Sequence, residues 1–106
     1  MRQWEIWKGR PDGVSRDHCF VLVSNQERLS SERRLTCNGL ICFTLRGSPL
    51  TTEVRLNSAD GFEHETVCDC DVMYLLAKSN LHSRIGMVSF ERQQQIKALL
   101  RLVFRL

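Results

Sequence analysis

The 106-residue chain has no long apolar run, no apolar leader and no internal repeat. A membrane-spanning helix needs roughly 18 or more consecutive apolar residues, and no stretch approaches that length. The N-terminal segment MRQWEIWKGRP mixes charged and aromatic residues, so it lacks the apolar core of a signal peptide. These absences argue against a membrane or secreted protein, and we expect a cytoplasmic one.

The chain also lacks the cysteine patterns of a disulfide framework or a structural zinc site. Five cysteines is an odd number, and no secretory segment accompanies them. Structural zinc sites usually pair cysteines two to four residues apart on turns, whereas Cys68 and Cys70 are separated by one residue within an apolar run. Cys37 and Cys42 straddle a predicted turn and strand. Free cysteines are often buried, so we predict buried thiols, no metal and no cofactor.

Length and charge fit a single small domain, residues 1–106, with one core. The net charge is +3, and residues 1–50 hold eight Lys and Arg against five Asp and Glu. The second half is balanced, with seven of each. A weak basic bias in the first half permits a nucleic-acid partner without requiring one.

Strand patterns dominate the first two-thirds of the chain. Alternating or short apolar runs predict strands at WEIW (4–7), FVLV (20–23), LICFTL (40–45), TTEVRL (51–56) and TVCDCDVMYLL (66–76). Turn residues separate them at GRPDG (9–13), NG (38–39), RGSP (46–49) and NSADG (57–61). In the last strand the alternation places Cys68 and Cys70 on one face, opposite Asp69 and Asp71. Short strands at this spacing predict an antiparallel barrel or small sandwich.

Helical patterns appear only near the end of the chain. KSNLHSR (78–84) is compatible with one or two helical turns. The stretch 89–106 is a stronger case, because Ser89 can act as an N-cap and Glu91 lies in the first turn. Its apolar positions, Ile96, Leu99, Leu100 and Val103, follow the spacing of one buried helix face, with Gln93, Gln94, Lys97 and Arg101 facing water. We therefore predict a mainly β protein with a C-terminal α-helix.

The order of these motifs resembles the MazF/PemK family of plasmid-maintenance toxins. WEIW, a basic loop, FVLVSN and LICFTL follow the first half of the family pattern, and VCDCDVMYLLAKSNLHSRIGMVSF resembles its more specific second half. The matching residues in that half are Cys70, Asp71, Lys78, Arg84, Ile85, Gly86 and Ser89. The resemblance implies an SH3-like small β-barrel with a C-terminal helix, usually a homodimer.

The resemblance also implies an activity: a metal-independent, sequence-selective endoribonuclease that cuts single-stranded mRNA, arrests growth and is silenced by an antitoxin protein. Such cleavage needs a base for the 2′-OH, an acid for the leaving 5′-oxygen and a cation for the phosphorane. Aligning on Ser24 and Asn25 places His18 where the family usually has an arginine, and Arg46 where it has threonine or serine. The aspartate of the family's CDQ motif is retained as Asp71.

These positions define the candidate site. We predict Arg46 as the cation for the phosphorane, with His18 and Asp71 in proton transfer and the roles of acid and base left open. Arg16, Ser48 and Arg84 are candidate substrate-binding residues. The three catalytic candidates also have structural alternatives. Arg46 could be a solvated turn residue, His18 a strand-edge histidine, and Asp71 a loop cap or a partner of Arg84.

Two other functions stay open. The first is a barrel of the same fold, altered in catalysis, that binds nucleic acid or a protein partner without cleavage. The second is a metal-binding regulator, which depends only on the cysteines.

Overall fold

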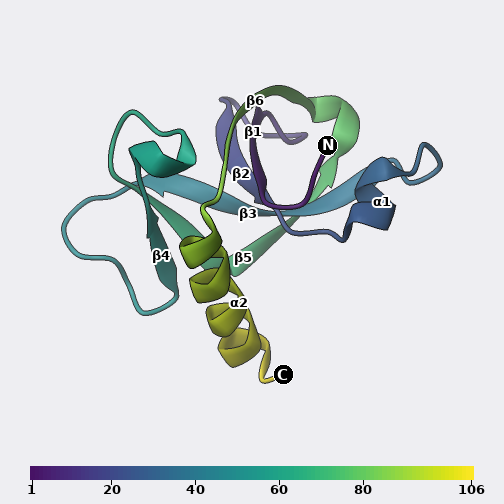
Figure 1. Ribbon diagram of the computed structural model, residues 1–106. Coiled ribbons are helices and arrows are strands. Elements are labelled where there is room, and N and C mark those ends of the chain that lie inside the picture. The colour runs from purple at the N-terminus through teal and green to yellow at the C-terminus, as the bar shows by residue number, and fades with distance from the viewer.

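The computed structural model describes residues 1–106 and contains six antiparallel strands, two α-helices and two short 3-10 helices (Figure 1). In chain order the elements are β1 (Glu5–Gly9), β2 (His18–Leu22), α1 (Gln26–Ser30), β3 (Thr36–Thr44), β4 (Glu53–Leu56), η1 (Ser58–Asp60), β5 (Thr66–Ala77), η2 (Lys78–Asn80), β6 (Leu81–Met87) and α2 (Phe90–Phe104). The strand order across the sheet is β4-β5-β3-β2-β1-β6. The mainly β fold with a C-terminal helix is as predicted.

The sheet is strongly bent, which makes the fold barrel-like. The start of β5 pairs with both β4 and the end of β3, and its second half pairs with the beginning of β3. Between these parts the β3–β5 register jumps, from Cys42 opposite Cys68 to Leu40 opposite Met73. Within the irregularity the Asp69 carboxylate accepts a hydrogen bond from the backbone N–H of Asp71 at 2.9 Å. Extra residues in one strand increase its bend and twist, so β5 can serve two parts of the sheet.

The two edge strands, β4 and β6, are not paired with each other, so the sheet is not closed by hydrogen bonds. Instead η1 packs against β6. A Cβ atom on Gly86 would lie 2.0 Å from the backbone oxygen of Asp60, and one on Gly61 would lie 2.5 Å from the oxygen of Ile85. The glycine of the RIG motif is therefore explained by a backbone-to-backbone contact that leaves no room for a side chain.

Asp60 ties this contact to the C-terminal helix. Its side chain is buried, and its two oxygens accept hydrogen bonds from the backbone N–H groups of Asn57 (3.0 Å) and Ser89 (2.8 Å). Because Ser89 is the N-cap of α2, one carboxylate fixes both the turn after β4 and the start of the helix. Ser89 occupies the predicted cap position, but its own side chain makes no capping hydrogen bond.

Two hydrophobic clusters cover the two faces of the sheet. The cluster under α2 includes Ile6, Leu40, Cys68, Cys70 and Ile96. The second lies beneath α1 and is built on Phe20, Leu22, Leu29, Cys37, Ile41, Leu76 and Leu81. The predicted inward orientation of Cys68 and Cys70 is confirmed, since both are fully buried while Asp71 is exposed.

The buried thiols should react slowly. A hydrogen bond with Cys42, together with burial, raises the pKa of Cys68, and a hydrogen bond with Cys68, together with burial, raises that of Cys70. Because the thiolate is the nucleophile, we expect both to resist iodoacetamide in the native protein. Partly exposed Cys19 is the internal control and should be labelled first in a mass-spectrometric time course. Labelling of Cys68 and Cys70 as fast as Cys19 would contradict their burial.

The C-terminal helix is confirmed, but its buried face is narrower than predicted. Ile96 is fully buried, whereas Leu99, Leu100 and Val103 are only partly covered. Gln93, predicted to face water, is half-buried and its side-chain amide donates to the carbonyl of Val88 at 2.8 Å. Figure 1 shows the reason: the C-terminal end of α2 projects beyond the strands, so Leu99 and Leu100 still pack against the core but the end of the helix has no sheet beneath it.

Ile96→Ala should therefore destabilise the protein much more than a substitution near the end of the helix. Removing a fully buried aliphatic side chain typically costs about 2–5 kcal/mol in free energy of unfolding. Arg101→Ala removes an exposed side chain near the end of the same helix and should change stability by less than about 0.5 kcal/mol. Urea denaturation of both variants measures the difference, and equal losses would show that the packing of α2 is different.

One local prediction is wrong and a second is only partly right. The Asn38-Gly39 pair lies inside β3, with Gly39 opposite Leu22 on one side and Tyr74 on the other. A Cβ on Gly39 would be 2.6 Å from the Leu76 side chain, so glycine here permits close strand packing rather than a turn. The segment 78–84 forms one 3-10 turn followed by β6, because pairing with β1 overrides its weak helical pattern.

Candidate active site

A shallow hollow of about 370 Å³ lies where β2 begins and β3 ends. We call it the cationic hollow, and its lining residues are Lys8, Arg16, Asp17, His18, Cys19, Cys42, Phe43, Thr44 and Arg46. Three of the predicted site residues, Arg16, His18 and Arg46, are therefore brought together. The lining holds three Lys or Arg side chains against one carboxylate, which favours an anionic ligand such as a phosphate.

Strand pairing explains how residues distant in the sequence meet here. His18 is the first residue of β2, and the next residue, Cys19, lies opposite Cys42 on β3. Arg46 follows the last residue of β3 by two positions, in a turn where Gly47 has a φ of +77°. The antiparallel β2–β3 pair thus places the start of one strand beside the end of the other. The His18 ring meets the Phe43 ring edge-on, with 6.5 Å between ring centroids.

The single carboxylate of the hollow is already paired. Asp17 accepts hydrogen bonds from Arg10 Nε at 3.1 Å and, at its other oxygen, contacts His82 Nε2 at 3.0 Å. Desolvation alone would raise the pKa of Asp17, but the hydrogen bonds from His82 and Arg10 outweigh it and hold the pKa below its ordinary value. Asp17 is therefore a weak base, and it anchors the loop that carries Arg16 and His18 to β6.

The other predicted site residues lie outside the cationic hollow. Ser48 lines an adjoining hollow of about 300 Å³, which also includes Arg46. Asp71 is exposed in the irregular part of β5 and lines neither hollow. Arg84 does not pair with Asp71; its guanidinium contacts the buried carboxylate of Glu5 instead. Burial opposes ionisation of Glu5, but hydrogen bonds from the Arg2 backbone, Trp7 and Arg84 lower its pKa.

Sequence reasoning missed Lys8, Asp17 and Phe43 at this site. Lys8 reaches the hollow because its β1 position lies opposite Cys19 on β2. Only the strand register reveals that placement. Phe43 is a stronger omission, since an aromatic residue three positions before Arg46 is visible in the sequence. Phe43 is 43% exposed, which is unusual for phenylalanine. Only the structure reveals that exposure.

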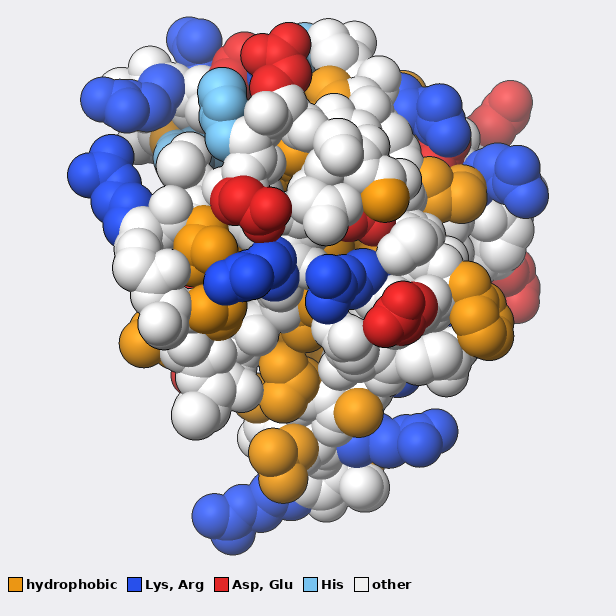
Figure 2. Space-filling view, turned by 60° about the vertical axis from the view of Figure 1, so that its left-hand side comes forward, with side chains coloured by type: hydrophobic (Ala, Val, Ile, Leu, Met, Phe, Trp, Pro, Cys, Tyr) orange, Lys and Arg blue, Asp and Glu red, His pale blue; other side chains and the backbone are white.

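A third hollow, of about 330 Å³, continues from the cationic hollow toward η1. We call it the phenylalanine hollow; it is lined by Lys8, Cys19, Cys42, Phe43, Thr44, Gly61, Phe62, Glu63, His64, Thr66 and Ile85. Phe43 and Thr44 line all three hollows, so together they form one continuous groove. On the face shown in Figure 2, Lys and Arg side chains gather around histidine at the upper left, with hydrophobic side chains exposed below.

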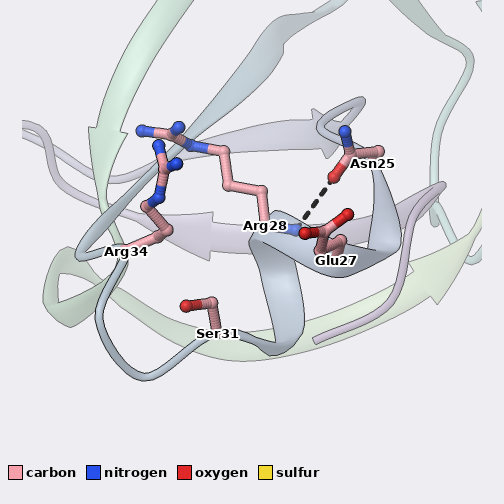
Figure 3. Close-up of a pocket in the computed structure, with 5 residues that line it drawn as sticks. All are labelled: Asn25, Glu27, Arg28, Ser31 and Arg34. Atoms are coloured by element: carbon pink, nitrogen blue, oxygen red, sulfur yellow. Dashed lines mark hydrogen bonds between the residues drawn. The ribbon is translucent and has the colours of Figure 1, made fainter.

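A separate polar hollow of about 250 Å³ lies beside α1, which follows the other end of β2 (Figure 3). Its side chains serve local structure. Asn25 caps α1 by accepting from the backbone N–H of Arg28 at 2.8 Å, and the Arg28 guanidinium donates to the carbonyl and hydroxyl of Thr36. Lys78 closes the other end of α1 through its ammonium, which donates to the carbonyls of Arg28, Leu29 and Ser31. The motif residue Lys78 therefore has a structural role.

Neither a metal cluster nor a membrane helix is found. No three His, Cys, Asp or Glu side chains are placed to hold a metal ion together. None of the helices combines the length and the apolar character that crossing a bilayer requires.

The fold is shared with solved endoribonucleases. A bent antiparallel sheet with a C-terminal helix over one face also occurs in an endoribonuclease from a mycobacterial species, solved in complex with its cognate antitoxin. The two chains superpose with a TM-score of 0.84 at 18% identity, over 100% of this chain and 96% of the other. A second mycobacterial endoribonuclease gives a TM-score of 0.79 at 19% identity, over 100% of this chain and 92% of that one.

A particular toxin shares the same fold. The Mycobacterium tuberculosis toxin MazF-mt6 superposes with a TM-score of 0.80 at 18% identity, covering 96% of this chain and 97% of the toxin. No protein-family model matches the sequence, and no curated protein matches it. The predicted MazF-like fold is thus confirmed by structure at an identity where sequence comparison alone finds nothing.

Proposed function

We propose that this protein is the toxin of a type II toxin–antitoxin system, an endoribonuclease that cleaves single-stranded mRNA in the cytoplasm at selected sequences and so inhibits growth. The observation that carries the proposal is the cationic hollow: His18 and Arg46 face one site, beside Lys8 and Arg16. The solved endoribonucleases and the solved toxin MazF-mt6, which have the same fold, support this choice of reaction.

In the proposed reaction the scissile phosphate lies in the cationic hollow. The Arg46 guanidinium donates two hydrogen bonds to its non-bridging oxygens, with Lys8 and Arg16 adding positive charge. A base removes the proton of the 2′-OH, the 2′-oxygen bonds to phosphorus, and the bond to the 5′-oxygen breaks as an acid protonates that oxygen. The products are a 2′,3′-cyclic phosphate and a 5′-hydroxyl. His18 serves one of the two proton transfers, because histidine is the side chain that most often acts as a general acid or base.

The remaining predicted residues have more distant roles in this proposal. Ser48 binds the RNA backbone in the hollow beside Arg46. Arg84, held by Glu5, is at most an outer contact for RNA. Asp71 is a candidate for the second proton transfer only if RNA binding or a second copy of the chain brings it to the phosphate, because it lies outside the cationic hollow.

The proposed cleavage needs no metal ion and no cofactor. Lys8, Arg16 and Arg46 supply the positive charge that metal ions supply in many other nucleases. The test is incubation of the purified protein with long single-stranded RNA in EDTA, followed by primer extension to map the cut sites. Cleavage at defined sequences that persists in EDTA supports the proposal. Intact RNA under all conditions, with or without added divalent ions, contradicts it.

We also propose that the toxin is a homodimer and is inhibited by an antitoxin protein. The projecting end of α2 exposes Leu102, Phe104 and Leu106, and β5 exposes Val72 and Leu75. Exposed apolar side chains on a small domain favour association, since each gains about 1.5–3 kcal/mol when fully buried. Light scattering coupled to gel filtration should give twice the monomer mass, and Leu102→Glu should reduce it.

A second candidate function is RNA or protein binding without cleavage. The separation of Asp71 from the cationic hollow favours it, because the hollow then holds only one ready proton-transfer group, His18. Strong RNA binding with no cleavage product, and normal growth on expression without an antitoxin, would select this alternative.

A further inference from the structure

The phenylalanine hollow has features that the cleavage chemistry does not use. It shares Lys8, Phe43 and Thr44 with the cationic hollow, so a ligand with its phosphate in one would extend into the other. Phe43 is 43% exposed, and its ring lies nearly perpendicular to that of His18, at an interplanar angle of 74°. Exposed aromatic rings beside a cationic groove are the usual stacking surfaces for unpaired bases.

The opposite part of the hollow is held in place by local structure. Phe62 is half-buried and packs against the core under α2. Its backbone N–H donates to the carbonyl of Asn57 at 3.2 Å, and Gly61 before it has a φ of +108°. The hydroxyl of Thr66, a buried residue, donates to the carbonyl of His64 at 3.1 Å. The backbone on either side of Glu63, at Phe62 and His64, is thus held by hydrogen bonds within the chain.

A carboxylate in the hollow would favour some bases over others. Glu63 provides its only carboxylate, and an ionised carboxylate only accepts hydrogen bonds. The Watson–Crick edge of guanine presents N1–H and an N2 amino group side by side, so one carboxylate can accept from both. Uracil presents a single N–H between two carbonyl oxygens, which a carboxylate repels.

We propose that the phenylalanine hollow is a nucleobase subsite that takes an unpaired guanine next to the scissile phosphate, stacked on Phe43 and read by Glu63. This inference rests on the proposed function, because it assumes that a single RNA strand lies along the groove. It assigns the sequence selectivity of cleavage to residues that perform none of the chemistry.

The test uses fluorescence anisotropy with 2′-fluoro nonamers U4XU4, where X is G, A, C or U. The 2′-fluoro group removes the attacking hydroxyl, so binding is measured without cleavage. We expect the wild-type protein to bind the guanine oligonucleotide about tenfold more tightly than the uridine one, the size of one good base contact. Phe43→Ala should weaken its binding by roughly 5- to 100-fold, the range of one base stacked on an aromatic ring.

Three further variants complete the test. Phe43→Tyr should restore most of the affinity, and Glu63→Gln should remove the difference between guanine and uracil. Phe90→Ala, which removes an exposed phenylalanine outside the groove, should bind as the wild type does. Equal binding of all four oligonucleotides by the wild type, wild-type affinity of Phe43→Ala, or a guanine preference that survives Glu63→Gln would overturn the subsite.

The subsite and the proposed function can fail separately. Guanine-selective binding that depends on Phe43, with no cleavage of the matching all-ribose oligonucleotide or of long RNA, would support the subsite and contradict the nuclease. Cleavage whose sequence preference is unchanged in Glu63→Gln would support the nuclease and contradict the subsite.

Discussion

Replacing His18 or Arg46 by alanine is expected to lower the rate of RNA cleavage by about 10²–10⁴-fold. A positioned acid–base group typically contributes 10²–10⁴-fold, and loss of one hydrogen-bond donor to a charged transition state typically costs about 10²–10³-fold. Both side chains line the cationic hollow and have no salt-bridge partner there. Single-turnover cleavage of a mapped RNA site measures the effect.

Arg33→Ala is the matched control for Arg46→Ala. Arg33 is also an exposed loop arginine, but it lines none of the hollows, so its loss should leave the rate within about twofold.

The variant Asp71→Asn tests whether Asp71, the third predicted catalytic residue, takes part in the chemistry. From its position outside the hollow we expect less than a tenfold loss, and a loss as large as that of His18→Ala would restore Asp71 to the chemistry. Wild-type rates for both His18→Ala and Arg46→Ala would show that cleavage occurs elsewhere.

Asp60→Ala should be among the most destabilising single substitutions in the protein. It leaves the backbone N–H groups of Asn57 and Ser89 without acceptors and opens a space under the contact between η1 and β6. Hydrogen bonds to charged groups contribute about 1.5–3 kcal/mol each, so the expected loss is about 3–5 kcal/mol. That is a large share of the 5–15 kcal/mol that stabilises a typical domain.

Thermal and urea unfolding measure this loss. Glu32→Ala removes an exposed carboxylate that makes no hydrogen bond or ion pair, and it should change stability by less than about 0.5 kcal/mol. Asp60→Asn keeps one acceptor oxygen and should fall between the two. If Asp60→Ala were as stable as Glu32→Ala, the clamp between β4, β6 and α2 would contribute nothing to the fold.

The two stability sites differ in how far the sequence revealed them. Ile96 belongs to a helical apolar pattern, so its burial could be predicted from spacing alone. Asp60 sits in the turn segment NSADG, where the local pattern accounts for its hydrogen bond to the Asn57 backbone but not for its burial. Its importance comes from Ser89, a residue 29 positions away.

The sequence by itself determined the features that depend on local periodicity. Alternation in 66–76 placed the thiols of Cys68 and Cys70 inward, and the apolar spacing after Ser89 gave the C-terminal helix, because side-chain direction within one element follows from backbone geometry. The order of the motifs, through the family resemblance, also grouped Arg16, His18 and Arg46.

Only the tertiary structure decided the contents of the site. Lys8 and Phe43 enter the groove through the register of β1, β2 and β3, whereas the irregular part of β5 leaves Asp71 outside it. Likewise, Asn38-Gly39 became strand because both neighbouring strands pair with it. Register depends on pairing between residues far apart in the chain, and a shift by one residue turns every side chain to the opposite face, so no local pattern could have fixed it.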